Sequence, residues 1–122
     1  MGDRVEMLEA ALDLIPSLGA ERARVLGHSD RFRAAMAKVG LDTGLSSTQI
    51  VPVIMGGERR AIAMSRALEA EGILGVAIRP PTVPVGTSRI RFALSARHTD
   101  ADIDRLIEVV ARLAATIPED PS

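Results

Sequence analysis

A proline-rich loop separates two strand-like segments in the second half of the chain and limits how they can be arranged. Residues 73–78 before it are almost entirely apolar, as expected for a strand that is covered on both faces. Residues 88–95 after it alternate between apolar and polar side chains. Pro80, Pro81 and Pro84 restrict the backbone between the two segments. Because a loop and not a helix joins these two segments, we expect them to run antiparallel.

The region before this pair predicts another strand and a crossover helix. Residues 49–55 are rich in β-branched side chains but contain Pro52, which cannot donate to a strand ladder, so this strand is expected at a sheet edge. Residues 58–71 have helical spacing and are followed by Gly72. A strand–helix–strand run makes its two strands parallel, and we expect the last strand between them.

Helices are predicted at both ends of the chain. Apolar residues recur at helical spacing over residues 5–15, and Pro16 is expected to end that helix. A second helix is predicted over residues 20–39. Thr99 and Asp102 have the spacing of a capping box at the start of the last helix.

The predicted order is therefore α-α-β-α-β-β-α, an α+β fold. It consists of a small, mainly antiparallel three-stranded sheet that helices cover on one face. With 122 residues, of which 47% are hydrophobic, the chain has room for one domain with one core. Within it, residues 1–17 are expected to form an interdomain or linker helix, and residues 118–122 a tail.

The composition argues against several classes of function. The formal net charge is -1 and Phe32 and Phe92 are the only aromatic residues, so we expect no nucleic acid partner. The chain has no cysteine, and His28 and His98 are expected on opposite sides of the core, so no metal site is expected. No apolar run is long enough to span a membrane and the N-terminus lacks a signal-peptide pattern, so a cytoplasmic location without a membrane partner is expected.

Arginine carries nearly all of the positive charge: the chain has fourteen arginines and one lysine, Lys38. Arginine binds carboxylates and phosphates through a rigid fork of donors, whereas amine chemistry needs a lysine. Arg79 and Thr82 lie on the proline-rich loop, and Arg91 lies on the polar face of the last strand, where Arg89 is predicted to be structural. Spacing alone leaves an anion site and a plain solvent-facing strand equally open, and it predicts no catalytic residue in this chain.

Two motifs carry a family resemblance. Residues 77–91 read A-I-R-P-P-T-V-P-x-G-T-x-R-I-R, and residues 94–106 read L-S-A-x-H-T-x-x-D-I-D-R-L. Together with G-L-D-T-G at 40–44 and T-Q-I-V-P-V at 48–53, they resemble the C-terminal segment of the 8-amino-7-oxononanoate synthases. These are pyridoxal-phosphate (PLP) enzymes of the α-oxoamine synthase family, and sister enzymes, among them serine palmitoyltransferase, usually differ before T-V-P.

The resemblance implies a place and a role for several residues. It implies that the chain is the C-terminal small domain of a fold type I PLP enzyme, a homodimeric transferase of biotin synthesis that condenses L-alanine with pimeloyl-CoA or a pimeloyl carrier protein. Arg91 then holds the amino-acid carboxylate, Thr82 contacts the acyl substrate or the external aldimine, and Arg79 helps to bind an anionic group of the acyl substrate. The Schiff-base lysine belongs to the large domain, so this chain alone is expected to bind no PLP and to be inactive.

Two alternatives stay open. The first is a freestanding α+β module, derived from this domain, that binds a small anion or a protein. The second keeps the family but changes the reaction to that of 2-amino-3-ketobutyrate ligase or 5-aminolevulinate synthase.

Overall fold

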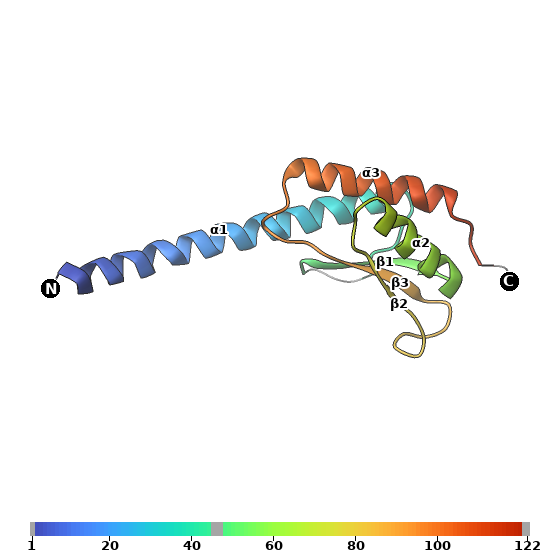
Figure 1. The fold of residues 1–122 in the computed structure, drawn as a ribbon, viewed down its shortest axis with the longest axis horizontal. Helices are drawn as coiled ribbons and strands as arrows, with labels where there is room; N and C mark the ends of the chain where they lie inside the picture. Colours follow the sequence, from blue (N-terminus) through green and yellow to red (C-terminus); the bar gives the residue numbers. More distant parts are fainter. Residues whose placement is uncertain (1, 45–47, 121–122) are drawn as a thin grey trace.

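The computed structural model of the chain describes residues 2–44 and 48–120, with side chains from residue 19 onward. Figure 1 shows an α+β arrangement with one long helix, α1, that extends far beyond the rest of the molecule at its N-terminal end. The elements are α1 (Gly2–Lys38), β1 (Ile50–Gly56), α2 (Glu58–Ala70), β2 (Val76–Ile78), β3 (Ser88–Ala93) and α3 (Asp100–Thr116).

The three strands form one sheet in the order β1-β3-β2, and β3 is antiparallel to both neighbours. Ile90 in the centre of β3 pairs with Val53 of β1 and with Ala77 of β2. The prediction that the last strand lies in the middle is confirmed, and so is the edge position of the strand that contains Pro52. In an edge strand the missing donor of a proline can face away from the ladder.

The second predicted strand is shorter than its apolar run suggested. Only Val76–Ile78 are in β2, and Leu74 just before it is 83% exposed. The expectation that this segment is covered on both faces is therefore wrong. Two apolar faces are buried only where layers pack on both sides of a sheet, and here the helices cover a single face.

One core lies between the sheet and the helices. α1 and α2 pack on the sheet, and α3 packs against both of these helices (Figure 1). Phe32 of α1 meets Phe92 of β3 edge to face, with ring centroids 5.4 Å apart, in a geometry that aromatic pairs favour. The other large core side chains are Met36, Val51, Val53, Met64, Leu68, Ile90, Ile103, Val109 and Val110.

The prediction that Pro16 ends a first helix is wrong, because α1 is continuous from Gly2 to Lys38. The observed order is therefore α-β-α-β-β-α, with one helix where two were predicted. A proline inside a helix removes one backbone donor and strains the preceding turn, at a cost of about 3 kcal/mol, but the helix can continue past it. The apolar side chains over residues 5–15 lie outside the described side chains. No described helix has the length and hydropathy that a membrane span requires.

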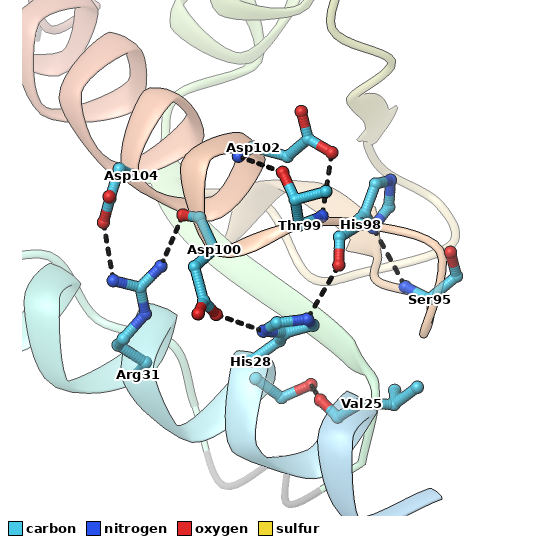
Figure 2. Close-up of polar contacts among 10 residues, drawn as sticks. Val25, His28, Arg31, Ser95, His98, Thr99, Asp100, Asp102 and Asp104 are labelled. Carbon is cyan, nitrogen blue, oxygen red and sulfur yellow. Dashed lines mark hydrogen bonds and ion pairs between the residues drawn. The ribbon is translucent and has the colours of Figure 1, made fainter. Parts of the chain in front are cut away.

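A polar joint fixes α1 to the turn between β3 and α3 (Figure 2). The buried His28 places Nε2 2.9 Å from the carbonyl oxygen of His98, so its Nε2–H donates to that carbonyl. His98 in turn accepts the backbone N–H of Ser95 through Nδ1, at 3.0 Å. The two histidines are thus neighbours, and the expectation that the core separates them is wrong.

Arg31 extends the same joint to the first turn of α3. Its guanidinium donates to the Asp100 carbonyl at 2.9 Å and to the carboxylate of Asp104 (Figure 2). Residues about seventy positions apart are thereby held together. Among the described residues, no group of three or more His, Asp or Glu side chains is placed to hold a metal ion.

The segment after α3 caps another helix. The Asp120 carboxylate accepts the backbone N–H groups of Arg59 at 3.0 Å and Arg60 at 2.7 Å, in the first turn of α2. The N-cap residue itself, Gly57, has no side chain to do this. A Cβ at Gly57 would lie 2.1 Å from Cγ of Asp120, so a glycine is required for the close approach of this carboxylate.

We predict that Asp120→Ala lowers the free energy of unfolding by about 1 kcal/mol, the usual worth of a helix cap. Gly57→Ala should destabilise the wild-type chain, because the new methyl group displaces the carboxylate. In the Asp120→Ala background the same glycine change should be nearly neutral, since the atom with which it clashes is gone. Urea unfolding of the four chains measures this coupling, and strictly additive effects would contradict it.

The predicted capping box at the start of α3 is confirmed. The Thr99 hydroxyl accepts the Asp102 N–H at 3.1 Å, and the Thr99 N–H donates to the Asp102 carboxylate at 2.9 Å. The Thr99 backbone N–H, and then the Thr99 side chain, hold the pKa of Asp102 below its ordinary value.

This lowered pKa predicts a pH dependence of stability. The ionised Asp102 stabilises the folded chain above its unfolded pKa, at about 3.9, and this contribution is lost as the pH falls through the lower folded pKa. The stability difference between the wild type and Asp102→Asn should therefore shrink from pH 5 to pH 2, as followed by urea unfolding. The control is Ala70→Ser, at an exposed position on α2, which changes no titratable group and should show no such trend.

Candidate functional site

The candidate site lies on the face of the sheet that the helices leave open. In β3 the side chains of Ile90 and Phe92 point into the core, so those of Arg89 and Arg91 point to the opposite face. The sheet register places Arg89 beside Ile54 and Ile78 of the flanking strands. The alternation of β3 therefore places both arginines on the exposed side of the sheet.

A groove of about 450 Å³ runs over this face. Apolar side chains make up much of its floor, and no described acidic residue lines it. A groove with cationic groups and no carboxylate is suited to bind an anion. Its lining residues are Thr48, Ile50, Pro52, Ile78, Thr82, Arg89 and Arg91.

Arg91 is the most available cation of this groove. Its side chain is exposed, and no hydrogen bond or ion pair joins it to any described residue. Its cross-strand neighbours, Pro52 and Val76, offer no charge. Arginine stays protonated at all relevant pH values and its fork of donors matches a carboxylate, so Arg91 can bind one bidentately.

Thr82 comes to the same groove from the proline-rich loop. Two turns order this loop: the Thr82 N–H donates to the Arg79 carbonyl at 3.0 Å, and the Thr87 N–H donates to the Pro84 carbonyl at 3.1 Å. Gly86 has φ of +85°, a conformation that favours glycine. A loop ordered in this way loses little entropy when it binds a ligand.

Arg79 is placed differently from the other two predicted site residues. Its Nη1 lies 3.0 Å from Oε1 of Glu58, in the first turn of α2, and it does not line the groove. The structure thus brings Arg91 and Thr82 together but not Arg79. Both members of the Arg79–Glu58 pair are about half exposed, and an exposed pair of this kind contributes only about 0–1 kcal/mol.

Arg89 lines the groove beside Arg91, although the sequence suggested only a structural role for it. Its Nε donates to the Thr87 carbonyl at 3.0 Å. The sequence already indicated that Arg89 and Arg91 lie on the same face of the strand, because residues two apart on a strand share a face. That alternation could not show whether an acidic neighbour would pair with Arg89.

A second cavity, of about 600 Å³, adjoins the groove. It lies between the segment Gly72–Val76 and the start of α3, and its lining includes Leu74 and Leu106. Arg91 lines both spaces. Lys38, the only lysine, is exposed in the last turn of α1 and lines neither of them.

The sequence matches known proteins over most of its length. The family model described as "Aminotransferase class I and II" matches residues 4–110. A protein of Paramagnetospirillum magneticum named "Putative 8-amino-7-oxononanoate synthase" is 55% identical over 111 residues, which cover 91% of this chain and 28% of that protein. The chain thus spans little more than a quarter of the length of the curated relatives that it matches.

Solved structures share the fold. The 8-amino-7-oxononanoate synthase of Francisella tularensis has a TM-score of 0.67 and 22% identity, over 87% of this chain and 32% of that one. A serine palmitoyltransferase of S. paucimobilis, solved with a bound PLP–myriocin aldimine, has a TM-score of 0.71 and 23% identity, over 79% of this chain and 25% of that one. Both match the α+β fold predicted for a C-terminal small domain of this enzyme class.

Proposed function

The chain belongs to the aminotransferase class I and II family, and on this premise we propose that it is the C-terminal domain of an 8-amino-7-oxononanoate synthase. The proposal is supported by relatives of that name at 55% identity and by the motifs at residues 77–91 and 94–106. The reaction joins Cα of L-alanine to the thioester carbon of a pimeloyl thioester. It releases the thiol carrier and carbon dioxide, the latter from the alanine carboxylate.

The observation that carries this proposal is the unpaired guanidinium of Arg91 on the open face of the sheet. Arg91 binds the α-carboxylate of L-alanine through two parallel N–H donors. The groove presents no described acidic side chain that competes for these donors. Because β3 is paired on both edges, the position of Arg91 varies little, and the alanine is oriented by a rigid element.

Thr82 and Arg79 complete the proposed contribution of this chain. Thr82 lines the groove next to Arg91 and contacts the acyl substrate through its hydroxyl. Arg79 helps to bind an anionic group of the acyl substrate, for which it has to leave Glu58. An exposed pair of this strength does not prevent such a movement.

The described residues of this chain do not fit a PLP site by themselves. PLP enzymes of this kind hold the cofactor on a lysine, and the one lysine here, Lys38, lies away from the groove. We therefore place PLP in a larger domain of the same polypeptide. The greater length of the relatives supports this placement.

The remaining partners are part of the same proposal. The complete enzyme is a cytoplasmic homodimer, and its acyl substrate is pimeloyl-CoA or a pimeloyl carrier protein. The open face of the sheet would then lie toward the larger domain, and the substrates would bind between the two. Turnover of L-alanine in preference to glycine or serine, measured on the complete enzyme, separates this reaction from those of the sister enzymes.

We predict that Arg91→Gln in the complete enzyme raises KM for L-alanine by about tenfold or more, because a hydrogen bond to a charged group is worth about 1.5–3 kcal/mol. The affinity for PLP, followed by its absorbance during titration, should stay within about twofold. Arg66→Gln, at an exposed position on α2, is the matched control and should change neither value. An equal loss of L-alanine and PLP affinity would contradict the role of Arg91.

A further inference from the structure

We propose that Arg89 is a second anion-binding residue of the groove and that it recognises the far carboxylate of a dicarboxylic acyl substrate. The identity of this substrate rests on the function proposed above. The binding of two anions in one groove rests on the geometry of β3 alone. Arg89 therefore decides whether the enzyme accepts an acyl chain with a terminal carboxylate or a plain fatty acyl chain.

The two arginines lie close together on β3. Arg89 and Arg91 are two residues apart on one face of β3, so their Cα atoms are about 7 Å apart at the usual rise of a strand. Both line the same groove of about 450 Å³. Two guanidinium groups so close repel each other unless an anion lies near both, and no described carboxylate lines this groove.

Arg89 is held at the base of its guanidinium and leaves its terminal donors available. Its Nε–H donates to the Thr87 carbonyl at 3.0 Å, which anchors the base of the guanidinium. Its terminal Nη atoms have no partner among the described residues. Arg60 and Arg105, which line other cavities, differ, since Arg60 donates to three backbone carbonyls and Arg105 donates to Glu71. Arg89 is thus oriented in advance, with donors left for a ligand.

The groove around the two cations is lined largely by apolar side chains. Ile50, Pro52 and Ile78 line the groove with Arg89 and Arg91. These apolar side chains can pack against the methylene chain of the acyl group. Arg91 can bind the carboxylate of L-alanine, and Arg89 can bind the carboxylate at the far end of the acyl chain. A fatty acyl chain would cover Arg89 without giving it an anion. The missing contact strongly disfavours a fatty acyl substrate, because the guanidinium of Arg89 is then removed from water and left without a partner.

A binding experiment on the 122-residue chain tests this inference with pimelate and heptanoate, which have the same number of carbons but two carboxylates and one. The probe is the Nε–H signal of each arginine in nuclear magnetic resonance spectra of the ¹⁵N-labelled chain. Pimelate should shift the signals of both Arg89 and Arg91, and heptanoate that of Arg91 only. Pimelate should also bind about threefold or more tightly, as expected for one added charge-assisted contact at an exposed site.

Substitutions of single arginines test which residue causes the preference for pimelate over heptanoate. Arg89→Gln should reduce the affinity for pimelate to that for heptanoate and leave the heptanoate affinity unchanged, whereas Arg89→Lys should keep part of the preference. Arg66→Gln, at an exposed position on α2 outside the groove, is the control and should keep all of it. Equal binding of both acids by the wild type overturns the inference. So does a preference that survives Arg89→Gln or disappears with Arg66→Gln.

Kinetics of the complete enzyme separate this inference from the proposed function. Arg89→Gln should raise KM for the pimeloyl thioester by about threefold or more while KM for L-alanine stays unchanged, and it should narrow the discrimination against a heptanoyl thioester. Equal changes in both KM values would overturn the role of Arg89. Failure of the wild-type enzyme to condense L-alanine with any acyl thioester would refute the proposed function. The preference of the 122-residue chain for pimelate is tested independently, by the binding experiment.

Discussion

The pairing of β3 with a strand on each side is the constraint on which the rest of the structure depends. The inward residues of this strand, Ile90 and Phe92, lie in the core, and the outward residues, Arg89 and Arg91, form the candidate site. A shift of register by one residue would bury both arginines and expose the core side chains, at a cost far above the stability of a small domain. The packing of the core therefore also positions the anion-binding groups, and the site needs no further support from a mobile loop.

The two arginines on the open face of the sheet differ from the arginines that hold the helices together. Elsewhere, arginines such as Arg31, Arg60 and Arg112 are bound to carboxylates or to carbonyls at helix ends, where they fasten α1, α2 and α3 to one another. On the open face, Arg91 and the Nη atoms of Arg89 have no described partner. Cations that serve the fold are thus neutralised within the chain, whereas those of the groove remain available to a ligand. This contrast, together with the family membership, supports a substrate-binding role for this domain.

Contacts between distant segments hold the frame around the sheet. His28 joins α1 to the turn before α3, and Asp120 closes the first turn of α2 from the other end of the chain. Each links residues at least sixty positions apart. Neither contact could be predicted from the sequence, because a histidine or an aspartate looks the same in a sequence whether or not a distant segment supplies its partner.

Local patterns in the sequence determined the elements and their order in the sheet. The edge position of Pro52, the central position of the last strand and the capping box at Thr99 depend only on near neighbours, so periodicity and residue type predicted them. The tertiary structure decided the rest: that Arg79 pairs with Glu58, and that Arg89 shares the groove with Arg91. The physical reason is that the partner of a side chain comes from segments far away in the sequence. The residues that can bind an anion were visible in the sequence, but only the folded chain shows which of them remain free to do so.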